Sequence, residues 1–86
     1  MSRLTAALIR EQGVTFVVAL MKNHVLDNPS LADDQIRAVA LHFGCPLVVL
    51  MAESNRRLRG NRQDVVDFVA NLHPSRIPWR QFDLAA

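Results

Sequence analysis

Three side chains of the sequence could together carry out nucleophilic chemistry: the only cysteine, Cys45, and two residues of one polar stretch, His24 and Asp27. A cysteine reacts as its thiolate, which a neighbouring histidine can generate, and a carboxylate can orient that imidazole. These residues define a candidate thiol site, and a single-thiol redox protein is the corresponding enzymatic hypothesis. A buried lone cysteine, however, usually behaves as a small hydrophobe. We favour this structural interpretation of Cys45 and assign no catalytic residue.

A second candidate site is a dense group of arginines, which could contact phosphates while Trp79 stacks on a base. Its members fall within seven positions of the sequence: Arg56, Arg57, Arg59 and Arg62. The alternative is a solvated hairpin, because charged side chains on an edge strand discourage pairing with other chains. The formal net charge is only +2, from 10 Lys and Arg against 8 Asp and Glu. This weak charge makes nucleic-acid binding the less favoured alternative.

The remaining chemistry-bearing residues indicate neither a metal nor a cofactor. The three histidines and the cysteine are dispersed, without the spacing of zinc ligands. His42 and His73 fall near the predicted C-terminal ends of helices, where a cation is stabilised by the helix dipole. The chain has three glycines, none of them grouped, so phosphate-binding and nucleotide-binding loops are missing. We therefore expect no metal site and no cofactor.

The elements that must position these residues centre on a short apolar run, Leu47–Met51, which follows Gly44 and is predicted to be a buried strand. Val14–Met21 is a second, nearly unbroken apolar run, typical of a strand covered on both faces. Between them, Leu31–Phe43 has apolar residues at helical spacing, with Ser30 as the predicted N-cap and Gly44 as the terminator.

Four further segments complete the predicted order of elements. The spacing of apolar residues predicts a helix from Ser2 to Gly13 and a last amphipathic helix over 62–72. The polar segment 22–29 is predicted to be a loop, and 57–59 is predicted to be an antiparallel edge strand. The predicted fold is a small α/β domain of two or three layers with the order α-β-α-β-β-α.

The 86 residues predict one domain, 1–86, and 50% of them are hydrophobic. A domain of this size buries only about 60% of its unfolded surface, so its stability is marginal. The C-terminal tail, 75–86, carries several large apolar residues: Ile77, Trp79, Phe82 and Leu84. The tail either packs on its own domain or anchors a second subunit or another protein partner.

Two further features concern the environment of the protein. No stretch approaches the ~18 apolar residues of a membrane span, so we expect no membrane partner. A single cysteine fits a reducing compartment, and we expect a cytoplasmic protein. No pattern indicates a particular small-molecule ligand.

The second half of the sequence resembles the C-terminal part of thioredoxin-like domains, in which a proline opens a strand and a hairpin, a glycine and an amphipathic helix follow. The matching residues are Pro46, Leu47–Met51, Gly60 and the helix Arg62–Leu72. The resemblance implies a truncated thioredoxin-like fold and places Cys45, before the proline, beside the family's active site. The Cys-x-x-Cys motif is missing, as is the strand that carries it, so a redox-inactive relative is implied.

Together these observations favour a small non-enzymatic interaction or assembly domain that self-associates, as a homodimer. Two alternatives stay open at this point. One is the single-thiol redox protein that uses Cys45, and the other is nucleic-acid binding through the hairpin from Arg56 to Arg62.

Overall fold

The computed structural model describes residues 2–84, with side chains from 3 to 83. Five strands form one mixed sheet in the order β4-β3-β2-β1-β5. The strands are β1 (Ser2–Glu11), β2 (Val14–Met21), β3 (Val48–Ala52), β4 (Leu58–Gly60) and β5 (Arg80–Leu84). The helices are α1 (Asn23–Asp27), α2 (Pro29–Phe43) and α3 (Gln63–Ala70), followed by a 3-10 turn, Pro74–Arg76.

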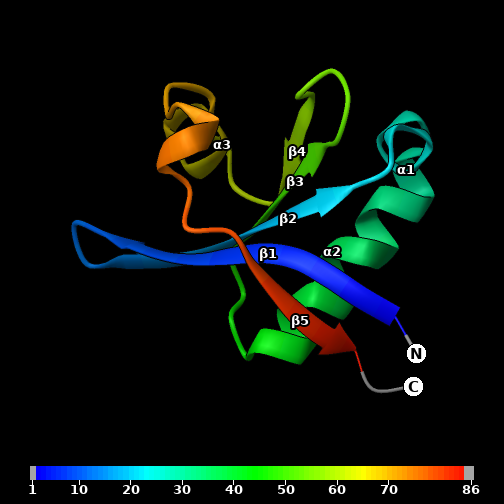
Figure 1. Ribbon diagram of the computed structural model, residues 1–86, viewed down its shortest axis with the longest axis horizontal. Helices are drawn as coiled ribbons and strands as arrows, with labels where there is room; N and C mark the ends of the chain where they lie inside the picture. The colour runs from blue at the N-terminus through cyan, green and yellow to red at the C-terminus, as the bar shows by residue number, and fades with distance from the viewer. Residues whose placement is uncertain (1, 85–86) are drawn as a thin grey trace.

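Helices cover both faces of the sheet, so the domain has three layers. Figure 1 shows α2 and α3 on opposite sides of β2 and β3. The core is accordingly divided into two clusters, one beneath α1 and α2 and one beneath α3 and the 3-10 turn. The predicted α/β architecture is confirmed at this level.

The two apolar runs are the buried centre of the sheet. β2 and β3 are parallel, with Val17 opposite Val48 and Met21 opposite Ala52, and α1 and α2 form the connection between them. Val17 packs towards α2 and its neighbour Val18 packs towards α3, and neither is exposed. Because both faces of these strands are covered, every position favours an apolar side chain.

The first predicted helix is wrong, because residues 2–11 form the long strand β1. Leu4 packs on the α2 face of the sheet and Ala7 on the α3 face, as in a strand covered from both sides. A hairpin then joins β1 to β2 through Gln12 and Gly13, whose φ angles are both positive, at 51° and 78°. Positive φ at both central residues is the geometry of the tight turns that match strand twist.

β1 changes partners along its length. Its second half pairs with β2 from Ala6, opposite Ala19, to Glu11, opposite Val14. Its first half pairs instead with β5, from Ser2 opposite Leu84 to Ala6 opposite Arg80. β1 therefore separates from β2 on the N-terminal side of Ala6, and Figure 1 shows the two strands diverging towards the right of the view.

The predicted helix over 31–43 is confirmed, but its start differs. Asn28, rather than Ser30, is the N-cap, and its side chain accepts a hydrogen bond from the Leu31 N–H, with Pro29 in the first turn. Proline suits that position because the N–H it lacks would have no partner within the helix. The predicted loop over 22–29 contains the short helix α1. Gly44 ends α2 in the left-handed conformation, with φ of 61°.

The end of the chain differs most from the predicted order. The last helix is shorter than the predicted 62–72, and the tail continues through the 3-10 turn into β5, which forms an edge of the sheet. The observed order is β-β-α-α-β-β-α-β, with α2 in the place of the predicted helix over 31–43 and α1 within the predicted loop that precedes it. Within residues 2–84 every peptide bond is trans, including the one that precedes Pro46.

Among the described helices, none combines the length and the apolar character needed to cross a membrane.

Candidate functional site

The structure does not bring the three residues of the thiol site together. Cys45 is buried, and its Sγ lies 3.5 Å from the carbonyl oxygens of Thr15 and Leu47, at the beginning of β2. His24 follows the other end of β2, in α1. At about 3.3 Å per residue, the strand between Thr15 and Met21 is about 20 Å long. The Cys45 thiol thus packs in the α2-side core, out of reach of the imidazole.

Most of the arginine group is paired with carboxylates of neighbouring helices. Arg57 pairs with Asp27 of α1, Arg59 pairs with Asp33 of α2 at 3.1 Å, and Arg62 pairs with Asp64 of α3 at 2.7 Å. These pairs neutralise three of the four guanidinium groups. β4, which carries Arg59, is an edge strand, in agreement with the structural interpretation of these charges.

The apolar side chains of the tail contact their own domain. Ile77 is buried in the α3-side core, and Trp79 packs against the same cluster. Phe82 lies on the opposite face, where its ring makes an edge-to-face contact with Phe43 at a centroid distance of 4.8 Å. The side chain of Leu84 lies outside the described part of the structure. For the three described side chains, the packing favours the intramolecular alternative.

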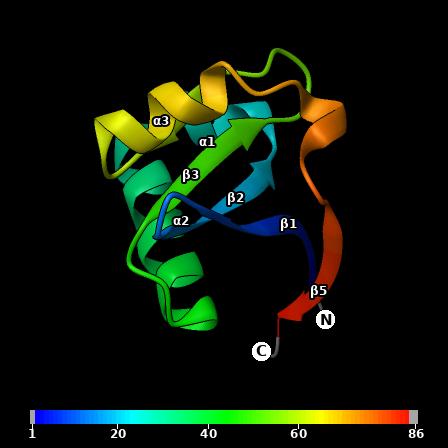
Figure 2. The ribbon, with the colours of Figure 1, turned by 90° about the vertical axis from the view of Figure 1, so that its left-hand side faces the viewer.

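The backbone of β5, in contrast, is the outermost strand beside β1. Figure 2 shows it along the outer margin of the molecule. The Val17 N–H donates to the Leu47 carbonyl, so the peptide groups of Val17 point towards β3. Those of its neighbour Val18 point towards β1, where Ala7 lies opposite. Alternation along β1 then directs the peptide groups of Leu4 towards its β5 partner, Phe82.

The same alternation assigns the peptide groups of β5. Those of Phe82 bond to β1, and those of Gln81 and Asp83 point away from the sheet. The outer edge of β5 thus presents an N–H and a carbonyl at each of two positions. Arg80, Gln81 and Asp83 have exposed side chains along this edge.

A groove of about 810 Å³ opens where β1 separates from β2. Leu4 of β1 and Leu20 and Met21 of β2 form its strand side, and α2 forms the opposite wall through Ala38 and Leu41. Ionisable side chains also line it: Arg3, Lys22, His24, His42 and Glu53. His24 is therefore part of this groove, which the sequence did not predict.

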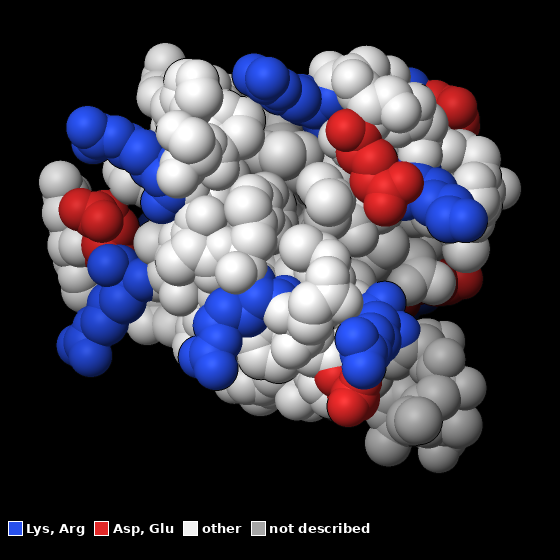
Figure 3. Space-filling view, in the orientation of Figure 1, with Lys and Arg blue, Asp and Glu red and all other residues white. Residues whose placement is uncertain are grey.

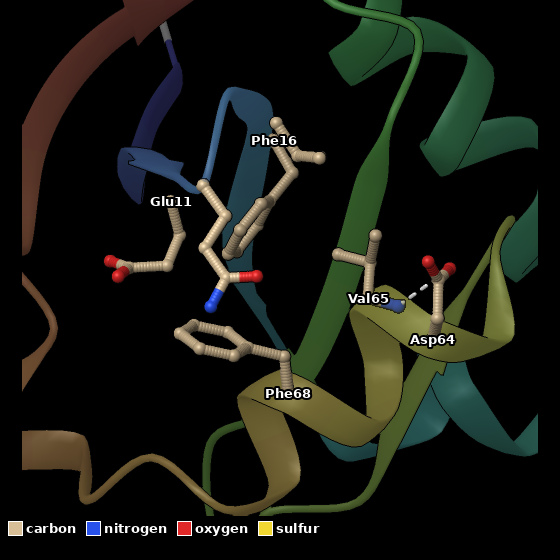
Figure 4. Close-up of a pocket in the computed structure, with 7 residues that line it drawn as sticks. Glu11, Phe16, Asp64, Val65 and Phe68 are labelled. Atoms are coloured by element: carbon tan, nitrogen blue, oxygen red, sulfur yellow. Dashed lines mark hydrogen bonds between the residues drawn. The ribbon is translucent and has the colours of Figure 1, made fainter.

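A smaller cleft of about 190 Å³ lies between the β1–β2 hairpin and α3. Phe16 and Phe68 form its apolar part, with ring centroids 5.9 Å apart. Figure 4 shows the carboxylates of Glu11 and Asp64 on opposite sides of this pair, and that of Asp64 accepts a hydrogen bond from the Val65 N–H. Asp64 is also paired with Arg62, so the two carboxylates do not converge on one point.

The described residues contain no group of three or more His, Cys, Asp or Glu side chains placed to hold a metal ion. Within the same range, no buried side-chain nitrogen or oxygen lacks a hydrogen-bond partner. The open β5 edge and the groove are two features of the described residues that could recognise another molecule.

Comparison with known proteins gives no match to a family model, to a curated protein or to a solved structure.

Proposed function

We propose that this chain is a non-enzymatic interaction domain that self-associates, and that the outer edge of β5 is the contact. The observation that carries the proposal is the outward direction of the peptide groups of Gln81 and Asp83 in an edge strand. An edge strand with such groups is a template for pairing with another strand. A second copy of the chain presents the same template, which is the condition for a twofold contact.

The edge is self-complementary in one antiparallel register. If Phe82 lies opposite the Phe82 of a second copy, Gln81 of each chain lies opposite Asp83 of the other. Gln81 and Asp83 are the residues with outward peptide groups, so the register forms four main-chain hydrogen bonds. The Gln81 carboxamide also lies opposite a carboxylate that can accept its N–H. No like charges face each other directly, which would be unfavourable.

The short length of β5 and the small contribution of each new contact favour a weak and reversible dimer. The strand has five residues, so the new ladder is short. Each hydrogen bond contributes roughly 0.5–1.5 kcal/mol net. The two Phe82 rings would meet at the closely spaced, non-hydrogen-bonded position of the ladder, where such a cross-strand pair adds only roughly 0.2–1 kcal/mol.

A matched pair of substitutions at one position tests the proposal. Gln81→Pro removes the outward N–H while leaving the β1 ladder intact, because that N–H does not face β1. Gln81→Ala keeps the N–H but removes the carboxamide, which donates to the Thr5 hydroxyl at 2.9 Å. Sedimentation velocity over a range of concentrations should show dimers for the wild type and for Gln81→Ala, and monomers for Gln81→Pro.

Hydrogen exchange gives a second measurement that locates the contact. In a dimer through β5, the amides of Gln81 and Asp83 become protected as the protein concentration rises. A wild-type protein that stays monomeric at millimolar concentration contradicts the proposal. Dimers that persist in Gln81→Pro, with Gln81 and Asp83 unprotected in the wild type, place self-association elsewhere and exclude the β5 contact.

A further inference from the structure

We infer that the hairpin end of β1 binds an extended strand of a partner protein, one in which an arginine and an acidic residue precede two apolar residues. The partner strand lies antiparallel to β1 along Leu8–Glu11, where β5 no longer covers the edge of the sheet. This stretch presents other main-chain groups than the outer edge of β5, so the site is separate from the β5 contact. Its outward main-chain groups, apolar side chains and charges define the partner.

The peptide groups of Leu8 point away from the sheet. Leu8 lies opposite Val17, whose peptide groups point towards β3 and thus away from β1. Residues opposite each other in an antiparallel ladder either both bond across it or both point outwards, so the Leu8 groups point outwards. The same holds for Arg10, which lies opposite Thr15, two residues before Val17. The edge therefore presents an N–H and a carbonyl at both Leu8 and Arg10.

β5 leaves this edge uncovered, because its pairing with β1 ends opposite Ala6. In the continued register, Pro78 falls opposite Leu8, and proline has no N–H to donate. The Trp79 N–H donates to the carbonyl of Ile77 at 2.8 Å, so the tail is bent where the ladder would continue. Outside the ladders and helices, none of the described main-chain hydrogen bonds reaches the outward groups of β1. Figures 1 and 2 both show the hairpin end of β1 away from β5.

The side chains beside these groups are apolar on both faces of the sheet. Leu8 is 53% exposed and, by alternation from Leu4 and Ala6, lies on the α2 face. Ile9 lies on the α3 face, partly buried against the α3-side core. An open strand edge that carries an exposed apolar residue favours pairing with another strand. Apolar residues of a partner strand opposite Leu8 and Ile9 cover both side chains.

Arg10 and Glu11 determine the charges of the partner strand. Their side chains point to opposite faces of the sheet, so they do not pair with each other. Among the described ion pairs, none involves either side chain. Opposite charges directly across an antiparallel pair are favourable and like charges are unfavourable. Read from its N-terminus, the antiparallel partner thus has a basic residue opposite Glu11, an acidic residue opposite Arg10, and then the two apolar residues.

The cleft between the hairpin and α3 favours arginine at the basic position. Its described lining includes Glu11 and Asp64 but no cationic side chain. Asp64 is already paired with Arg62, so Glu11 is the carboxylate that can pair with a guanidinium. Phe68, in the same lining, is 37% exposed, and a guanidinium can lie on such a ring. The volume of about 190 Å³ is below the roughly 300–1,000 Å³ of small-molecule pockets, as expected for a cleft that takes one side chain.

The face that β1 crosses has the corresponding distribution of charge. Figure 3 shows charges of both signs at its left end, where Figure 1 places the β1–β2 hairpin, and a largely uncharged middle. A partner strand whose charged pair precedes its apolar residues matches this arrangement.

Two synthetic peptides of the same composition test the inference. One has the central sequence Arg-Glu-Val-Val and the other Glu-Arg-Val-Val, both flanked by threonines. The first should bind the wild type and shift the amide signals of Leu8 and Arg10 in a nitrogen-15 spectrum. The second places like charges opposite Arg10 and Glu11, so it should bind about tenfold more weakly.

Hydrogen exchange locates the bound strand. In the free chain, the amides of Ala7 and Ile9, which bond to β2, should exchange slowly, and those of Leu8 and Arg10 should exchange fast. The Arg-Glu peptide should protect the amides of Leu8 and Arg10. Slow exchange of these two amides in the free monomer would mean that the edge is already covered, and it would overturn the inference.

Exchanging the two charges of β1 should exchange the preference between the peptides. Arg10→Glu combined with Glu11→Arg leaves the net charge unchanged and alters only exposed side chains. This double variant should bind the Glu-Arg peptide about tenfold more tightly than the Arg-Glu peptide. Leu8→Ala should weaken binding of either preferred peptide. Leu41→Ala is the matched control, because Leu41 is an exposed leucine of α2 outside this edge, and it should leave binding unchanged.

A wild-type spectrum that neither peptide changes at millimolar concentration contradicts the inference. Equal binding of the two peptides, or an unchanged preference in the double variant, contradicts it as well. Repeating the titration with Gln81→Pro keeps the result distinct from self-association. Binding that persists in Gln81→Pro supports the β1 site whether or not β5 forms a dimer, and binding lost there would place the peptide on β5 instead.

Discussion

Asn61 and Val48 are joined by a reciprocal pair of hydrogen bonds. The Val48 N–H donates to Oδ1 of Asn61 at 3.1 Å, and the Asn61 N–H donates to the Val48 carbonyl at 3.3 Å. The Asn61 carboxamide also donates to the carbonyl of Pro46 at 2.6 Å. The Asn61 side chain thus provides hydrogen-bond partners for the main chain at the beginning of β3, and it fixes this strand to the segment between β4 and α3.

Asn61→Ala should destabilise the fold, because it removes the acceptor of an N–H on a residue with no exposed surface. Leaving such a buried group without a partner costs about 1–3 kcal/mol. Urea unfolding measures this change in the free energy of unfolding. Asn55→Ala is a suitable control, because the Asn55 side chain accepts a hydrogen bond from Arg57 in an exposed turn. Equal losses in the two variants would contradict the role assigned to Asn61.

A second prediction concerns Gly60, which has no room for a side chain. A Cβ at this position would lie 2.6 Å from Cγ2 of Val66, 3.0 Å from the carbonyl oxygen of Val48 and 3.1 Å from Cγ2 of Val49. Gly60→Ala should therefore cost about 1–3 kcal/mol through overpacking. Adding Val66→Ala should recover part of that loss, which urea unfolding of the double variant would measure.

Gly44 provides the contrasting case for this prediction. A Cβ there would have nothing within 4 Å, but the φ of 61° is unfavourable for most side chains. Gly44→Ala should be destabilising by about 1 kcal/mol, and Val66→Ala should give it no relief. Relief of both glycine variants by Val66→Ala would show that steric contact is not the cause at Gly60.

The strands and helices with strong periodicity were predictable, whereas the partner exchange of β1 was not. Val14–Met21 and Leu47–Met51 were recognised because both faces of a central strand favour apolar residues. The first segment misled the prediction because Leu4, Ala7 and Leu8 fit helical spacing as well. Their strand conformation comes from pairing with β2, the next element, and with β5, which lies at the other end of the described chain, and such tertiary context overrides local preference.

The candidate sites depended still more on tertiary contacts. Polar and apolar side chains alternate over the second half of Arg80–Leu84, and this alternation is a strand signal that could have indicated β5 in the tail. The groove had no such signal, because Leu20 and Ala38 line it together only through the folded arrangement of β2 and α2. Likewise, Cys45 and His24 had suitable chemistry, but the parallel arrangement of β2 and β3 places them at opposite ends.

Burial of Cys45 predicts a slow reaction with alkylating agents. The residue is 6% exposed and contacts two carbonyl oxygens, so iodoacetamide reaches it only when the fold opens. We expect alkylation of the native protein to be far slower than in urea, and destabilising variants such as Asn61→Ala to accelerate it. Mass spectrometry over time measures both rates. Native alkylation as fast as in urea would favour the single-thiol hypothesis instead.

The ion pairs of Arg57 and Arg59 predict how the protein responds to polyanions. Asp27 and Asp33 neutralise these guanidinium groups, all four side chains being about half exposed. Exposed pairs stabilise a fold by only about 0–1 kcal/mol each, so Asp27→Asn with Asp33→Asn should leave it intact while adding two net positive charges. Binding to a heparin column or to single-stranded DNA should then become stronger and more sensitive to salt than in the wild type. Asp34→Asn together with Asp67→Asn adds the same charge at carboxylates that pair with neither Arg57 nor Arg59, and it should have a smaller effect. Tight, salt-dependent binding by the wild type that is lost with Arg57→Ala and Arg59→Ala would instead support nucleic-acid recognition by this group.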